Sequence, residues 1–206
     1  MKALLINGSP NERGCTYTAL SEVDKTLKNH DVQTELLYLG KKPIQSCTAC
    51  FACMQTGRCV FKDAVNDVQD RIDTIDAIVI GSPVYYGSAT GHLKSFLDRL
   101  FFPVQERMAG KLGAAVVSCR RAGASATFDQ LNKYFTICNM PVVSSQYWNQ
   151  VHGFTPEDVM KDEEGMQTMR TLGENMAWLL ASIEAGRKNS VPFPQYEKVV
   201  RTHFIR

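Results

Sequence analysis

The amino-acid sequence predicts a single α/β domain in which a five-stranded parallel sheet carries helices on both faces. Short apolar runs alternate with segments of helical periodicity, which is the order of strands and helices in a parallel sheet. The apolar runs are nearly continuous, as expected for strands that are buried on both faces. A chain of 206 residues is long enough for one domain with a full hydrophobic core.

Five segments are expected to be strands. The first, KALLIN, is a short apolar run that leads into a glycine-containing loop, and the third, DAIVIGS, ends at a proline. VQTELLYL, LGAAVVS and PVVSS repeat this composition of β-branched and apolar residues. In chain order, the expected strands span residues 2–7, 32–39, 76–82, 112–118 and 141–145.

Each expected helix follows a strand and has apolar residues along one side. Leu20, Val23 and Leu27 are at helical spacing in the first helix, and Leu172 and Met176 belong to the apolar side of the long last one. In chain order, the helices are expected at about 16–29, 64–73, 91–101, 125–138 and 157–185.

The domain is expected to span residues 1–186, with a cysteine-rich insertion at 47–59. From residue 187 on, the sequence is polar and contains prolines. Residues 187–206 are therefore predicted to form an extended C-terminal arm and not a second domain.

The composition, 44% hydrophobic and 21% charged, is that of a soluble globular protein. A net charge of +2 gives no reason to expect nucleic acid or a membrane surface as a partner. The apolar runs are far too short to span a bilayer. The N-terminal segment lacks the apolar region and cleavage site of a signal peptide, so a cytoplasmic location is expected.

Four of the seven cysteines lie within the segment CTACFACMQTGRC. Cys47, Cys50 and Cys53 recur every three residues, and Cys59 follows a glycine that allows a turn. This spacing can bring four thiolates to a [4Fe–4S] cluster, as in bacterial ferredoxins. Zinc is an alternative, although zinc sites normally use two separated C-x2-C pairs. The third alternative is that the thiols hold no stable metal.

Three loops that follow strands are expected to meet at the carboxyl edge of the sheet, where open parallel sheets bind their ligands. The first, at 8–16, combines glycines and hydroxyl groups with a helix start, which suits a phosphate but also makes ordinary turns and caps. The second, at 82–91, has adjacent tyrosines that suit a planar aromatic ligand or pack on the helix below. The third, at 118–125, has two arginines that either contact an anion or are solvated.

The segments GSPNERGCT, SPVYYGSATGHLKSFLDR and SCRRAG, in this order, resemble the NADPH-dependent FMN reductase family over about residues 1–150. The inserted cysteine motif is similar to that of the iron–sulfur flavoproteins within this family. The resemblance implies a flavodoxin-like fold with strand order 2-1-3-4-5. It also implies non-covalent FMN, with its phosphate on the first loop and its ring against the second.

Carried over residue by residue, the resemblance assigns the cofactor to matching positions of the three loops. The phosphate positions are Ser9, Arg13, Cys15 and Thr16, the ring positions are Pro83, Val84, Tyr85, Tyr86 and Gly87, and the third loop matches at Ser118 and Gly123. The candidate metal ligands are Cys47, Cys50, Cys53 and Cys59. The family commonly has asparagine at position 15, and a thiol is a weaker donor than an amide, so backbone N–H groups and Thr16 are expected to hold more of the phosphate.

These features predict an FMN-dependent oxidoreductase that transfers electrons between a reduced donor, NAD(P)H or ferredoxin, and a small acceptor or redox protein. No side chain is predicted to act as a catalytic acid or base, and the four histidines, isolated in sequence, are expected to be structural. One rival is a cluster-free NAD(P)H-dependent reductase of flavin, quinone or azo compounds. Another is a non-enzymatic flavodoxin-like carrier or metal-binding module. The resemblance further implies a homodimer or homotetramer, with residues 145–154 and the arm as candidate contacts.

Overall fold

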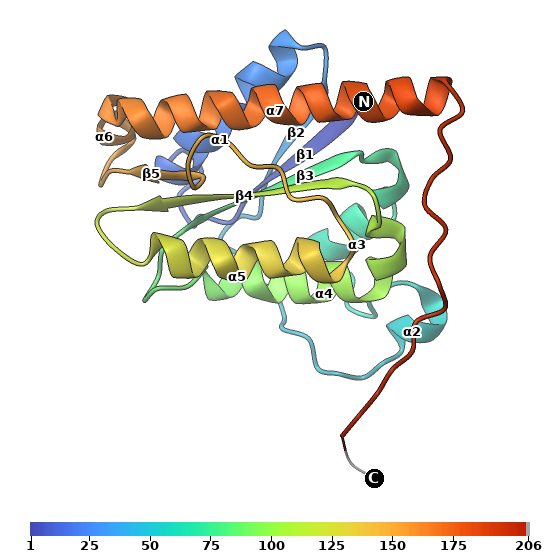
Figure 1. Cartoon of the computed structure of the whole chain (residues 1–206). Helices are drawn as coiled ribbons and strands as arrows, with labels where there is room; N and C mark the ends of the chain where they lie inside the picture. Colours follow the sequence, from blue (N-terminus) through green and yellow to red (C-terminus); the bar gives the residue numbers. More distant parts are fainter. Residues whose placement is uncertain (205–206) are drawn as a thin grey trace.

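A computed structural model of the chain describes residues 1–204, which form a five-stranded sheet in the order β2-β1-β3-β4-β5 (Figure 1). All neighbouring strands are parallel. The strands are β1 (Lys2–Asn7), β2 (Gln33–Tyr38), β3 (Ala77–Pro83), β4 (Leu112–Cys119) and β5 (Gln150–His152). The strand order predicted from the family resemblance is confirmed.

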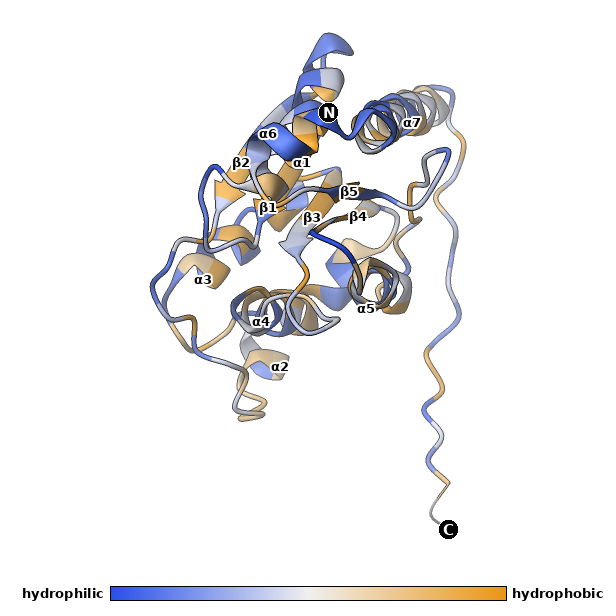
Figure 2. Cartoon of the chain, turned by 90° about the vertical axis from the view of Figure 1, so that its left-hand side faces the viewer, coloured by the Kyte–Doolittle hydropathy of each residue, from blue (hydrophilic) through white to orange (hydrophobic). Residues whose placement is uncertain are grey.

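Helices cover both faces of the sheet, as Figure 2 shows with the strands lying between two helical layers. One layer has α1 (Cys15–Asn29), α6 (Pro156–Lys161) and α7 (Glu163–Lys188), and the other has α3 (Ala64–Gln69), α4 (Gly91–Met108) and α5 (Ala124–Ile137). A 3-10 turn, η1 (Ile72–Thr74), follows α3, and the short helix α2 (Cys53–Thr56) lies in the cysteine segment. None of the helices in residues 1–204 could cross a bilayer, because none is both long and apolar enough.

The core consists of two apolar layers, because successive strand side chains point to opposite faces. In β3, Ile78 and Ile80 pack toward α4 and α5, while Val79 packs toward α1 and α7. All three side chains are 0% exposed. Burying a side chain of this size contributes about 1.5–3 kcal/mol, so the three central strands account for much of the stability that positions the loops.

The fifth strand is not where the sequence predicts it. Residues 141–145 pair with β4 through a single bridge, Gly113 to Val142, and the strand itself is β5, at 150–152. Ser145 makes a side-chain turn instead, with its Oγ 2.6 Å from the carbonyl of Tyr147 and 3.3 Å from its N–H. Such local side-chain bonds compete with a sheet ladder. The chain therefore leaves the sheet after its first contact and rejoins it at the carboxyl end of β4.

Three helices also differ from the predicted ranges, and one of them, predicted at 64–73, ends at Gln69 and is followed by η1. The helix predicted at 157–185 is two helices, α6 and α7, because the backbone of Asp162 leaves the helical region and its side chain caps α7 by accepting from Gly165 N–H at 3.0 Å. The helix predicted to end near residue 101 continues to Met108, with a kink at Val104 just after Pro103.

The end of the chain beyond α7 has no helix or strand over residues 191–203. In Figure 1 this segment runs along one side of the domain and then away from it. Its apolar side chains are exposed, among them Phe193, Tyr196 and Val200. The predicted arm, 187–206, begins within the last residues of α7 and ends at residues 205–206, which lie outside the described residues.

Candidate functional site

A buried asparagine at the end of β1 shapes the first loop. Asn7 is 0% exposed; its Oδ1 accepts from the N–H of Ser9 at 3.1 Å, and its Nδ2 donates to the carbonyl of Glu12 at 3.0 Å. The hydroxyl of Ser9 accepts from the N–H of Asn11 at 3.1 Å and keeps its own hydrogen for donation. In the sequence, Asn7 is only the last residue of the first expected strand, and nothing near it indicates this role.

The N-terminus of α1 adjoins this loop and suits an anion. Gly14 caps the helix without a side-chain hydrogen bond, and its first turn contains no acidic residue. An uncapped helix start offers unpaired N–H groups and a partial positive charge. The thiol of Cys15 instead lies 3.8 Å from the carbonyl of Gly153, and burial raises its pKa. Because the thiol is occupied, Cys15 can donate to an anion only through its backbone N–H. The side chain of Arg13, nearby in the loop, is exposed.

Hydrogen bonds tie the three loops together at the carboxyl edge of the sheet. The buried hydroxyls of Thr16 and Ser118 are 2.8 Å apart and join the first loop to the third. The carbonyl of Ser118 accepts from the N–H of Val84 at 3.0 Å and joins the third loop to the second. Thr90, which was not among the predicted site residues, donates through Oγ1 to the carbonyl of Gly8 at 2.8 Å and joins the second loop to the first. The predicted loops thus form one connected unit.

The second loop presents its tyrosines to solvent on a tight turn. The backbone groups of Tyr85 and Ser88 pair in both directions, at 2.8 and 3.0 Å. Tyr86 and Gly87 between them both have left-handed φ, 51° and 73°, as a type I′ turn requires. Tyr86 is fully exposed and Tyr85 is 49% exposed. The two rings therefore do not pack on the helix below, and they offer flat, partly apolar surface next to Pro83 at the end of β3.

The third loop packs against this turn at Gly123. Its φ is 86°, and an added Cβ would lie 2.8 Å from Cγ1 of Val84 and 3.0 Å from Cα of Gly87. From the other side, Gln130 of α5 accepts from the hydroxyl of Ser88 at 2.9 Å and so holds the turn to the helix. Sequence pattern gives no signal for Gln130, because it is one polar residue on an amphipathic helix.

The cysteine segment leaves the sheet after β2 and folds over α4. Cys47 and Cys50 are exposed, whereas Cys53, at the start of α2, and Cys59 are half-buried. Gly57 ends α2 with φ 67°, which is the turn that the sequence predicts. Ala49 and Phe51 also have left-handed φ, 53° and 56°, a conformation that is strained for residues with side chains.

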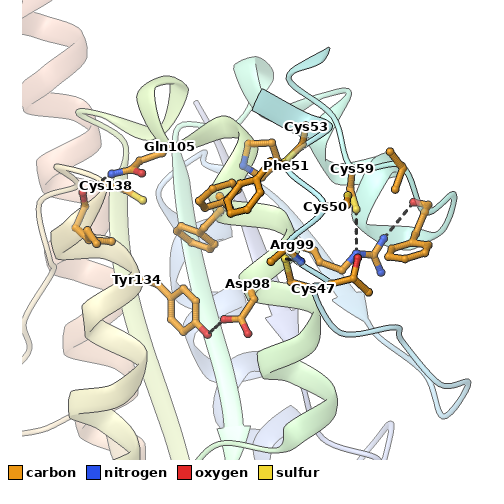
Figure 3. A pocket seen from close by; sticks show the side chains of 18 residues that line it. Cys47, Cys50, Phe51, Cys53, Cys59, Asp98, Arg99, Gln105, Tyr134 and Cys138 are labelled. Atoms are coloured by element: carbon orange, nitrogen blue, oxygen red, sulfur yellow. Dashed lines mark hydrogen bonds between the residues drawn. The ribbon is translucent and has the colours of Figure 1, made fainter. Parts of the chain in front are cut away.

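All four cysteines of the motif line one cavity of about 390 Å³. Its other walls come from α4 and α5 and include three aromatic side chains, those of Phe101, Phe102 and Tyr134, of which Figure 3 labels Tyr134. Burial raises the pKa of Cys53, and the negative charges that the three other motif cysteines carry as thiolates raise it further. Cys138 lines the cavity too, and burial raises its pKa to about 11, so it remains a neutral thiol.

The four thiols that line this cavity are suitable ligands for iron, but they do not lie close enough together to bind it as they stand. Four thiols are the ligands that a [4Fe–4S] cluster takes, and here they share one cavity. Within residues 1–204, however, no three cysteine, histidine or acidic side chains lie close enough together to hold a metal ion. The loop would therefore have to draw its exposed thiols inward to ligate a cluster.

The predicted site residues thus form two separate groups, one at the sheet edge and one in the cysteine cavity. The three strand-end loops meet at one edge of the sheet, whereas the four cysteines lie beside α4 and α5. Sequence patterns give no signal for Asn7, Thr90 and Gln130, which shape the loop edge, or for Arg99, which lines the cysteine cavity (Figure 3).

Comparison with known proteins gives consistent matches. The sequence profile described as NADPH-dependent FMN reductase matches residues 1–155. An iron–sulfur flavoprotein of Methanocaldococcus jannaschii is 29% identical, over 89% of this chain and 100% of its own. One of Methanosarcina thermophila is 26% identical, over 91% and 99%. A solved flavodoxin from the domain Archaea shares the fold, with a TM-score of 0.60 at 15% identity over 88% of this chain and 99% of that one.

Proposed function

Because the chain belongs to the NADPH-dependent FMN reductase family, we propose that it passes electrons from NAD(P)H or ferredoxin to a small acceptor or redox protein as an FMN-dependent oxidoreductase. One observation supports this proposal most directly: buried hydrogen bonds connect the three strand-end loops to one another at one edge of the sheet. Bound FMN supplies the redox chemistry, since it accepts electrons in pairs and releases them singly.

The first loop and the start of α1 would hold the phosphate. The Ser9 hydroxyl, the N–H groups of the first turn and the hydroxyl of Thr16 are the neutral donors near this helix end, and Arg13 adds a positive charge. A helix N-terminus stabilises an anion through its unpaired N–H groups and its dipole. These residues bind and orient the cofactor, and none of them has to transfer a proton.

The turn of the second loop would hold the ring. Tyr85 and Tyr86 are exposed at the same edge as the phosphate loop. Their flat surfaces can stack on a planar ligand and exclude water from one side of it. Gly123 lets the third loop approach this turn closely, so the ring position is fixed by backbone packing as well as by side chains.

FMN titration of a matched pair of arginine variants tests this assignment. Arg13→Gln is expected to weaken FMN binding about tenfold, because it removes a charge-assisted contact to phosphate. Riboflavin, which lacks the phosphate, should bind Arg13→Gln and the unmodified protein with equal affinity. Arg170→Gln, which removes an exposed arginine on α7, should leave both affinities unchanged. Purified protein without flavin absorbance, and without FMN binding on reconstitution, would refute the proposal.

We further propose that Cys47, Cys50, Cys53 and Cys59 hold a [4Fe–4S] cluster. Their shared cavity and their donor chemistry support this. Protein purified anaerobically is expected to contain iron and sulfide and to give an EPR signal on reduction. Cys50→Ser should lose the iron. Cys138→Ser, which changes a thiol of the same cavity outside the motif, should keep it. Equal iron content in all three proteins would contradict the assignment.

The second candidate is a cluster-free NAD(P)H-dependent reductase of flavin, quinone or azo compounds. The open arrangement of the four thiols favours it. Iron and sulfide analysis separates the two candidates. NAD(P)H or reduced-ferredoxin oxidation that depends on both FMN and an acceptor would exclude the third interpretation, a non-enzymatic carrier or metal-binding module.

We also propose a cytoplasmic homodimer or homotetramer. Exposed aromatic and apolar side chains support assembly, namely the Tyr147–Trp148 pair and those of residues 191–204. Light scattering of the purified protein measures the mass, and a monomer at micromolar concentration would contradict the assembly.

A further inference from the structure

The largest fully buried side chain in residues 1–204 is that of Arg99, in the middle of α4. A buried guanidinium is stable only if its charge is paired and its five N–H groups find acceptors. The carboxylate of Asp63 pairs with it in a fork, with contacts of 2.6 and 2.9 Å. The ring of Phe61 lies 5.1 Å from the guanidinium carbon.

The three remaining N–H groups bind the cysteine segment. Nη1 donates to the carbonyl of Gln45, Nη2 to the carbonyl of Phe61, and Nε to Sγ of Cys59, each at 3.1 Å. Gln45 precedes the first cysteine of the motif, and Phe61 follows the last. Arg99 therefore joins the two ends of the loop that contains all four thiols.

Cys59 is held at three of its atoms, unlike the other motif cysteines. Its N–H donates to Oε1 of Gln69 at 3.1 Å, and its carbonyl accepts from Nδ2 of Asn66 at 2.8 Å. Arg99 holds the sulfur itself (Figure 3). Cys47 and Cys50, by contrast, are exposed. One thiol of the four is thus fixed to the domain before any metal is bound.

We propose that Arg99 is a positioning residue for the cysteine loop: it closes the loop at its base and fixes the sulfur of Cys59 as the first ligand, on which the exposed thiols converge. The sulfur role rests on the proposed cluster, whereas the loop closure does not. In loaded protein, the N–H···S contact and the adjacent positive charge withdraw electron density from one ligand sulfur. This stabilises the more reduced, more negative cluster and raises its reduction potential.

Three variants on α4 test the proposal. Arg99→Gln removes the charge and most donors, and Arg99→Lys keeps the charge but loses the fork and its fixed geometry. Arg107→Gln is the matched control, because Arg107 also forms a bidentate pair with an aspartate, Asp73, but on the surface. Far-UV circular dichroism and bound FMN establish that each variant is folded. If Arg99→Gln does not fold, Arg99→Lys alone is used for the measurements.

Hydrogen exchange of metal-free protein tests the loop closure. Backbone N–H groups of residues 45–63, including that of Cys59, should exchange about tenfold faster in either Arg99 variant, because the contacts at the loop base are lost. Exchange in this segment should be unchanged in Arg107→Gln. Unchanged exchange in the Arg99 variants would overturn the proposal.

A redox titration followed by EPR tests the sulfur contact. The cluster potential should shift to more negative values in Arg99→Lys and stay constant in Arg107→Gln; iron loss in folded Arg99→Lys also supports the positioning role. An unchanged potential at full iron content would overturn that role. If the unmodified protein itself holds no iron, the proposed cluster fails, while the exchange result still decides whether Arg99 closes the loop.

Discussion

Replacing Gly123 by alanine should weaken FMN binding without unfolding the domain. Gly123 stands where the third loop packs on the turn of the second, and its φ of 86° is in the left-handed region. An added Cβ would lie 2.8 Å from a methyl group of Val84 and 3.0 Å from Cα of Gly87. The valine methyl group can turn aside, but the glycine backbone cannot, so the two loops must separate.

Two terms make up the expected effect. A left-handed backbone costs a residue with a side chain about 1–2 kcal/mol, which lowers the stability of the whole domain. Separation of the loops adds a local term, because it moves the proposed ring-binding turn away from the phosphate loop. The Gly87 backbone has to move by a few tenths of an ångström, and a resulting loss of about 1.4 kcal/mol in binding would raise the FMN dissociation constant about tenfold.

The control is Gly40→Ala, at φ 77° with no atom within 4 Å of the added Cβ. Both variants should lower the urea midpoint, because both place a side chain in the left-handed region. Fluorescence titration of FMN should show weaker binding only in Gly123→Ala. Equal FMN affinity in the two variants would refute the argument that close packing at Gly123 positions the site.

Three further changes have expected outcomes. Thr16→Val leaves the buried hydroxyl of Ser118 without a hydrogen-bond partner, which should lower the free energy of urea unfolding by about 1–3 kcal/mol. Recovery of stability in the double variant with Ser118→Ala checks this cause. Hydrogen bonds from Arg71 lower the pKa of Glu35 below its ordinary 4.5, so this pair stabilises the fold above that pH and stops doing so as pH falls through the lowered pKa. Glu35→Gln should thus be less stable at pH 7, and its difference in urea midpoint should vanish in acid. Gly113→Ala would place a Cβ 2.4 Å from a phenylalanine ring of α5 and should destabilise the core by about 1–3 kcal/mol, with unchanged FMN affinity in the folded protein.

The central strands are predictable because their signal is local. Ile78, Val79 and Ile80 form a short apolar run, which is typical of a strand buried on both faces. The edge strand lacks such a signal: Val142 and Val143 look like a strand, yet the ladder is completed at 150–152, where one of three residues is buried. An edge strand has one neighbour, so a local turn at Ser145 is enough to displace it.

In the candidate site, too, some features are predictable from local sequence and others are not. Loops with glycines, hydroxyls and adjacent tyrosines after strands indicate where a ligand binds. The residues that hold these loops, such as Asn7 and Gln130, are single polar side chains whose partners lie on other elements. Arg99 is the clearest case, since an arginine in an amphipathic helix is normally solvent-exposed, and here it is buried among acceptors from residues 45–63.

The sequence by itself determined the alternation of strands and helices, the family resemblance and the four-cysteine motif, because apolar periodicity and residue spacing are properties of neighbouring positions. Only the tertiary structure decided which hydroxyls meet between loops, which strand completes the sheet, and which thiol is fixed. Those outcomes depend on contacts between distant residues, such as Thr16 with Ser118 and Cys59 with Arg99. No local pattern encodes such contacts, because each is set by how the elements pack against one another.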